Sequence, residues 1–221
     1  MNDIIQTSGY FSLIVQFATM FIDTIVLAFR TNPINNDIKA LLTIENVVNY
    51  VESAFYVWML FNIKRIQNIT KHRYYDWAIT TPTMLFTYIM YLLMTKKRED
   101  HESTALLGLI QSEKYTLAVV FLLNWTMLFF GYLSETGRMK TKLATFLGFI
   151  PFLAMFYIIF SKYVTLHGSY LTFIYFVAVW AFYGIAALLN YKLKNTFYNI
   201  LDIFSKNFFG LFLAYMVVFR K

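Results

Sequence analysis

The stretch RYYDWAITTP, residues 73–82, places an arginine and an aspartate at the start of a long apolar run. Runs of this kind usually enter a membrane, where an ionised side chain at mid-depth costs at least about 2.5–3.5 kcal/mol. Arg73 lies three residues before Asp76, so both project from the same side of a helix and their charges can balance each other. The stretch therefore predicts a membrane helix with a functional charge inside it.

The rest of the chain has the composition of a membrane protein. Of its 221 residues, 59% are hydrophobic and only 14% are charged, against about 45–50% and about 25% in typical soluble domains. The net charge of +7 is spread over short loops, which disfavours nucleic-acid binding. The chain has no cysteine, and its histidines lack a second ligand at metal-like spacing. We therefore expect neither disulfides nor a metal site.

Seven apolar segments are each long enough to cross the hydrocarbon core, which needs about 20 residues. They lie near residues 10–29, 40–61, 74–94, 115–133, 143–163, 170–190 and 196–219. Their hydrophobicity is continuous rather than alternating, which favours helices over a barrel. We expect an all-α membrane protein with a single seven-helix domain over residues 1–221. Lys and Arg divide almost equally between the two sets of loops, so they do not decide the orientation.

Charged side chains interrupt these apolar segments. They are Asp23, Glu45, Glu52, Asp76, Asp202 and Lys206. Asp23 and Glu45 lie nearer to segment ends, where they either reach the membrane interface or serve a site. Asp202 and Lys206 are four residues apart and face the same way. A lysine in apolar surroundings can form a Schiff base with an aldehyde, and the protonated product needs a carboxylate counterion, for which Asp202 and Asp76 are candidates.

Together these motifs resemble those of the microbial (type 1) rhodopsins. Residues 73–82 match the third-helix motif of that family, and ILDIFSK at residues 200–206 matches its retinal-lysine motif. The resemblance implies all-trans retinal bound covalently to Lys206, with Asp76, Asp202 and Arg73 as the counterion complex. It also implies a multi-pass protein of a host-cell or plasma membrane, with its N-terminus outside and its C-terminus in the cytoplasm. Members of the family are not enzymes, so no catalytic residue is expected.

The same resemblance indicates which side chains surround the retinal. They are Tyr74, Trp77, Thr80, Thr81, Met84, Met127, Gly131, Trp180, Tyr183 and Ser205. Gly184 and Ala187 depart from the proline and tryptophan that the family usually has at these positions. The end of the pocket that would hold the β-ionone ring of retinal is therefore either larger or filled by the side chain of Phe149, Phe152 or Phe156.

Polar side chains recur at helical spacing on the first, second, third and seventh segments. The positions expected to line an ion path are Ser12, Gln16, Glu45, Asn49, Glu52, Asn199, Asp202 and Asn207. A single stripe of this kind can be a hydrogen-bonded contact between helices, whereas several stripes with added carboxylates favour a hydrated cation path. The second-segment glutamates and SKN at 205–207 resemble the channelrhodopsins. They also resemble viral rhodopsins of giant algal viruses, whose first group are light-gated cation channels.

The resemblance thus implies a retinal-binding photoreceptor that acts as a light-gated channel for monovalent cations or protons. Isomerisation and deprotonation of the Schiff base would open a hydrated path along the four polar stripes. Two alternatives stay open. One is a slow outward proton pump, in which Thr87 stands where a cytoplasmic carboxylate donor is usual; the other is a sensory rhodopsin. The lipid bilayer is the expected partner, and a homo-oligomer is a further expectation that the sequence leaves open.

Overall fold

The computed structural model describes residues 3–29, 35–99, 105–165 and 169–219, which are helical nearly throughout. In chain order the first six helices are α1 (Asp3–Ala28), α2 (Asn36–Asn62), α3 (Ile69–Glu99), α4 (Leu106–Glu135), α5 (Thr141–Tyr163) and α6 (Tyr170–Ala186). A seventh crossing follows, made of α7 (Tyr191–Asp202), a π-helical turn (Ile203–Asn207) and α8 (Phe208–Phe219). The described residues contain no strand, and they cross the bundle seven times, as the sequence predicts.

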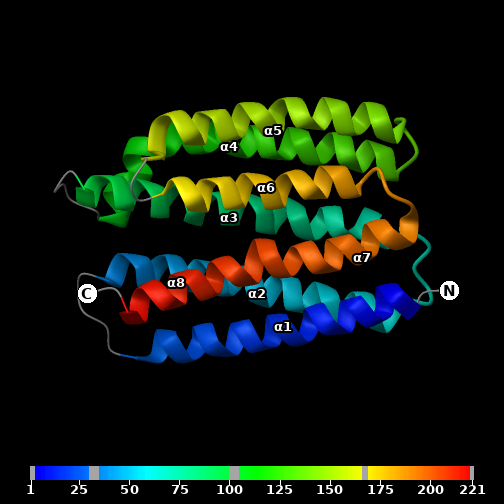
Figure 1. Cartoon of the computed structure of the whole chain (residues 1–221), viewed down its shortest axis with the longest axis horizontal. Coiled ribbons are helices and arrows are strands. Elements are labelled where there is room, and N and C mark those ends of the chain that lie inside the picture. The colour runs from blue at the N-terminus through cyan, green and yellow to red at the C-terminus, as the bar shows by residue number, and fades with distance from the viewer. Residues whose placement is uncertain (1–2, 30–34, 100–104, 166–168, 220–221) are drawn as a thin grey trace.

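The crossings pack side by side in one bundle (Figure 1). Helices α4 and α5 pair along one edge of the bundle, α1 lies along the opposite edge beside α2 and the seventh crossing, and α3 and α6 lie between. Helix α1 contacts α2, α7 and α8, and α2 also contacts α3. These contacts bring the polar faces of α1, α2, α3 and the seventh crossing toward a shared interior.

Hydropathy and exposure fit a bundle surrounded by lipid. Five helical stretches in the described part of the chain are long and apolar enough to cross a membrane, and α6 is apolar but only 17 residues long. Helix α2 spans 27 residues, yet its buried face carries Glu45, Asn49 and Glu52. Some helices begin earlier than predicted: α4 starts at Leu106 rather than near residue 115, and α3 at Ile69 rather than near residue 74.

Two breaks in helical hydrogen bonding are compensated by neighbouring helices. Pro82 in α3 has no N–H, so it frees the carbonyl of Ala78 four residues earlier, and the Trp125 indole of α4 donates to that oxygen at 2.9 Å. In the π-helical turn, the Phe204 carbonyl accepts a hydrogen bond from the Tyr175 hydroxyl of α6 at 2.6 Å. Both contacts tie the helices that carry the predicted site to the rest of the bundle.

Candidate functional site

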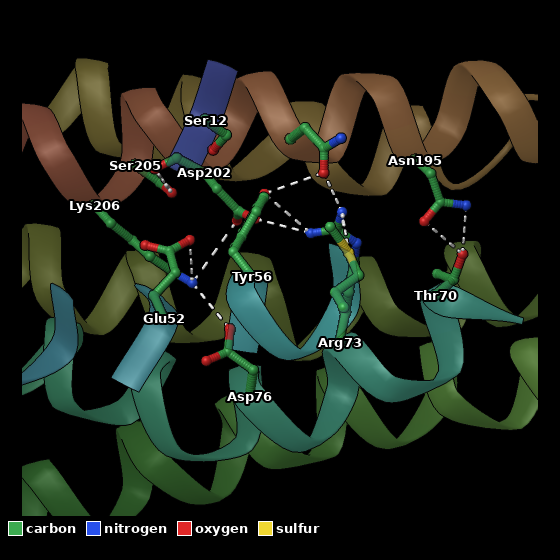
Figure 2. A network of polar contacts seen from close by, with 12 residues as sticks. Ser12, Glu52, Tyr56, Thr70, Arg73, Asp76, Asn195, Asp202, Ser205 and Lys206 are labelled. Carbon is green, nitrogen blue, oxygen red and sulfur yellow. Dashed lines mark hydrogen bonds and ion pairs between the residues drawn. The ribbon is translucent and has the colours of Figure 1, made fainter. Parts of the chain in front are cut away.

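Lys206 lies in the π-helical turn of the seventh crossing, and its side chain is buried among carboxylates. The residue is 1% exposed, and its Nζ donates to Glu52 Oε1 at 2.9 Å and to Asp76 Oδ2 at 3.1 Å. Asp202 Oδ1 is more distant, at 3.8 Å from the same nitrogen. Figure 2 shows the amine pointing between Glu52 of α2 and Asp76 of α3. The structure therefore brings both predicted counterions to Lys206 and adds a third carboxylate.

Asp202 is held mainly by partners other than the lysine. Its Oδ2 accepts from Arg73 Nη1 at 3.0 Å and from the Tyr56 hydroxyl at 2.6 Å, while Oδ1 accepts from the Tyr183 hydroxyl at 2.7 Å. Arg73 is fully buried, and it also donates to Tyr56 Oη at 3.2 Å and to Asn199 Oδ1. The buried Arg73 charge makes the Asp202 carboxylate tolerable, because unpaired buried charges are strongly unfavourable.

A cavity beside Lys206 is lined by residues of α3, α4, α5, α6 and the seventh crossing. Of the predicted pocket residues, it is lined by Tyr74, Trp77, Thr81, Met84, Met127, Gly131, Trp180, Tyr183, Ser205 and Lys206. Thr80 is buried outside this lining and donates to the Asp76 carbonyl at 3.0 Å. Asp76, Arg73 and Asp202 are not among the lining residues, although Asp76 and Asp202 lie near the Lys206 amine.

A side chain of α5 occupies the part of the cavity beside Gly184, where the ring of retinal is expected. A Cβ added to Gly184 would lie 2.8 Å from two carbons of the Phe149 ring, so this ring occupies the space that a side chain at position 184 would need. Phe149, Phe152 and Ala187 all line the cavity. Phe149 thus occupies the space beside Gly184, in line with the second of the two expectations from the sequence.

The eight predicted ion-path residues are all buried, and together with Asp23, Asp76, Thr87 and Lys206 they form what we call the polar column. Its members are Ser12, Gln16, Asp23, Glu45, Asn49, Glu52, Asp76, Thr87, Asn199, Asp202, Lys206 and Asn207, each at most 6% exposed. Asp23 and Glu45 are 0% exposed, which corrects the reading that places them at the membrane interface. The interface reading fails because both project inward from α1 and α2, toward the interior between helices, rather than toward the lipid.

Local pairs of hydrogen bonds organise this column. Gln16 Nε2 donates to Ser12 Oγ at 3.1 Å, and Asn49 Nδ2 donates to Asp23 Oδ2 at 3.1 Å. The Thr87 hydroxyl donates to Glu45 Oε2 at 2.6 Å. Among the described residues, no hydrogen bond joins Ser12 to Glu52, Asn199 or Asp202, whereas Tyr56 and Arg73 link Asn199 to Asp202.

Sequence reasoning gave three side chains too small a role. Tyr56 joins Arg73 to Asp202, and its place four residues after Glu52 on the same helical face was the available signal. Asp23 was left open between the membrane interface and a site, whereas it is fully buried. Thr87 was noted for lacking a carboxyl group, and its contact with the carboxylate of Glu45 was not predicted. That last contact depends on how α2 packs against α3, which a single sequence does not reveal.

Comparison with known proteins agrees with this geometry. The model of the bacteriorhodopsin-like protein family matches residues 7–219. Among solved structures, the viral rhodopsin OLPVRII is 26% identical with a TM-score of 0.83, and the match covers 96% of each chain. The blue light-absorbing proteorhodopsin from Med12 is 20% identical with a TM-score of 0.74, covering 96% of this chain and 95% of that one.

A more distant match has the same fold. The proton-pumping rhodopsin AR2 from the marine alga Acetabularia acetabulum is 16% identical with a TM-score of 0.75, covering 100% of this chain and 98% of the other. A search of curated protein sequences finds no match. Retinal bound through a lysine Schiff base is the known property of the family whose model matches. With nearly its whole length matched, the chain belongs to the bacteriorhodopsin-like family, the microbial rhodopsins.

Proposed function

We propose that the protein is a light-gated cation channel whose path follows the polar column. The observation that carries the proposal is the set of buried oxygens in that column. One side-chain oxygen each of Gln16, Asp23, Glu45, Asn49, Glu52 and Asp76 is buried with no hydrogen-bond partner among the described protein atoms. Buried polar atoms in native proteins are nearly always satisfied by protein or water. A column rich in open carboxylate and amide oxygens favours water and cations.

Lys206 is the proposed attachment site of all-trans retinal, and the cavity fits such a group. Its walls include the rings of Trp77, Trp180 and Tyr183, and of the described residues that line it only Lys206 carries a primary amine. A largely apolar cavity with one reactive amine suits a hydrocarbon that carries a single aldehyde. When bound, retinal supplies the absorption of light and the change of shape that follows.

The proton on the Lys206 nitrogen is the proposed trigger. Glu52 and Asp76 accept hydrogen bonds from this nitrogen at 2.9 Å and 3.1 Å. Transfer of its proton to Asp76 Oδ2 would remove a positive charge from between the carboxylates. Glu52 would then lose the cation that stabilises its buried position, and its contact with the seventh crossing would weaken. A gate of this kind needs an interaction that exists in one state only, which these two hydrogen bonds provide.

A slow outward proton pump is the second candidate, and the contact of Glu45 with Thr87 favours it. The sequence alone shows a threonine where a pump usually has a cytoplasmic carboxylate donor. In the structure, the Glu45 carboxylate reaches that position from α2, with its Oε2 at 2.6 Å from the Thr87 hydroxyl. A sensory role remains the third reading from the sequence. In each case we propose that the N-terminus is outside and the C-terminus cytoplasmic.

Voltage clamp of cells that express the protein with all-trans retinal tests the proposal. We expect light-induced currents that reverse sign with voltage and whose reversal potential follows the cation gradient. A current that stays outward at every voltage would refute the channel and support the pump. A visible pigment with a photocycle but no current at any voltage would support the sensor instead.

The variant Glu52→Gln tests the path at one residue. It keeps the size of the side chain but removes a charge 2.9 Å from Lys206 Nζ, so we expect altered conductance or cation selectivity with the pigment retained. The matched control is Glu113→Gln on α4, where the carboxylate contacts Lys162 and Tyr163 outside the polar column. Currents unchanged in both variants would remove Glu52 from the path.

A further inference from the structure

Gly210 of α8 is packed against polar side chains of α1 and α2. A Cβ added at this position would lie 2.8 Å from Asp23 Oδ2 and 3.2 Å from Asn49 Nδ2. Because Gly210 has no side chain, Asp23 and Asn49 can occupy the space beside it. Gly210 follows Lys206 by four residues, so it lies about one helical turn from the backbone of Lys206, toward the end of α8.

Asp23 is in an unusual electrostatic position at this contact. It is 0% exposed, and Asn49 Nδ2 donates to its Oδ2 at 3.1 Å. Its Oδ1 has no hydrogen-bond partner, and no ion pair among the described residues includes Asp23. A fully buried carboxylate is either protonated or accompanied by a cation, because an isolated buried charge is too unfavourable. The protein itself supplies only a neutral amide there.

A second buried side chain lies on the π-helical turn of the seventh crossing, which contacts both α1 and α2. Asn207 lies three residues before Gly210, so the two positions share a helical face. Asn207 is 0% exposed, and neither its Nδ2 nor its Oδ1 has a hydrogen-bond partner in the described part of the chain. The Oδ1 of Asn49 is likewise open. Carboxylate and amide oxygens are the ligands that hard cations prefer.

We propose that Asp23, Asn49 and Asn207 form a binding site for a monovalent cation between α1, α2 and the seventh crossing, with Gly210 leaving the room that Asp23 and Asn49 need. Asp23 supplies one negative charge, which matches one positive charge, and the amide oxygens supply neutral ligands. This inference rests on the proposed function, because it names a stopping point for the ion within the polar column. Under the proposed orientation, the site lies on the cytoplasmic side of Lys206.

Infrared spectroscopy of the purified pigment in the dark tests the site without any need for a current. We compare samples in sodium and in N-methyl-D-glucamine, a cation too large for a buried site. The wild type should show a carboxylate band that changes with the cation, and Asp23→Asn should lose that change. Asp37→Asn, which removes a carboxylate in the first turn of α2, should keep it. A carboxylic-acid band that disappears in Asp23→Asn and ignores the cation would show that Asp23 is protonated and would overturn the site.

Voltage clamp then tests whether the site lies in the ion path. Asp23→Asn keeps the shape of the side chain, and Gly210→Ala forces a methyl group against the carboxylate; both should retain the visible band. We expect each to lower sodium permeability relative to N-methyl-D-glucamine by about tenfold or more, the factor that corresponds to one charged contact. Wild-type permeability in Asp23→Asn together with an unchanged cation-dependent band would refute the site while the channel stands. Absence of wild-type current would refute the channel, and the infrared comparison would still decide the site.

Discussion

The contact between Gly184 and Phe149 allows a quantitative test of how the ring end of the cavity is built. A Cβ at position 184 would lie 2.8 Å from two ring carbons, whereas ordinary contact begins near 3.4 Å, so the ring must move by roughly 0.6 Å (3.4 − 2.8). Overpacking of this kind costs about 1–3 kcal/mol, and alanine returns up to about 1 kcal/mol of helix propensity. We therefore expect Gly184→Ala to destabilise the pigment by about 1–2 kcal/mol. For a chain of this length that lowers the melting temperature by about 2–8 °C.

The assay is the loss of visible absorbance on heating in the dark, with the band position recorded before heating. Phe149→Leu removes the ring that obstructs the new methyl group, so the double variant should be more stable than the sum of the two single changes by about 1 kcal/mol. Gly108→Ala is the control, because an added Cβ there meets nothing within 4 Å. It should melt no lower than the wild type. Gly184→Ala melting like the wild type, with no coupling to Phe149→Leu, would refute this packing.

Three further predictions concern other parts of the bundle. Lys206→Ala should form no visible band with all-trans retinal; a pigment that survives would mean that retinal is attached elsewhere or not at all. Thr87→Val removes the donor 2.6 Å from buried Glu45 and should cost about 1–3 kcal/mol of thermal stability, with Thr87→Ser restoring it. Lys194→Met leaves Glu135, whose side chain is 7% exposed, without the cation at 2.6 Å. It should lower stability by about 1–3 kcal/mol, and an unchanged melting curve would show that the pair contributes nothing.

Much of the architecture follows from local information in the sequence. Seven long apolar runs predict seven crossings, since each helix satisfies its own backbone in lipid. Helical spacing places Asp202 and Lys206 on one face, and it does the same for Arg73 and Asp76. Each of these pairs lies within one crossing of the bundle, so no knowledge of packing is needed. The structure adds the ion pair of Arg73 with Asp202 at 3.0 Å, which joins the two faces.

What the sequence could not predict are contacts set by the rotation of one helix against another. The contact of Thr87 with Glu45 depends on the angle at which α2 meets α3. The burial of Asp23 depends on α8, where Gly210 allows a close approach. The sequence pattern of a polar stripe is the same whether the stripe faces lipid headgroups, another helix or an ion path. Only the neighbouring helices distinguish these outcomes.

The contact between Glu52 of α2 and Lys206 of the seventh crossing has a consequence for the proposed gating. It lies on α2, yet its Oε1 is 2.9 Å from Lys206 Nζ, whereas Asp202 of the seventh crossing is 3.8 Å away. At an effective dielectric constant of about 20, these distances correspond to gross attractions of about 6 and about 4 kcal/mol. Asp202 would keep Arg73 as a partner after the lysine nitrogen lost its proton, but Glu52 has no second cation within ion-pair distance among the described residues. The loss of that proton would therefore act most strongly on α2, the helix that also carries Glu45 and Asn49.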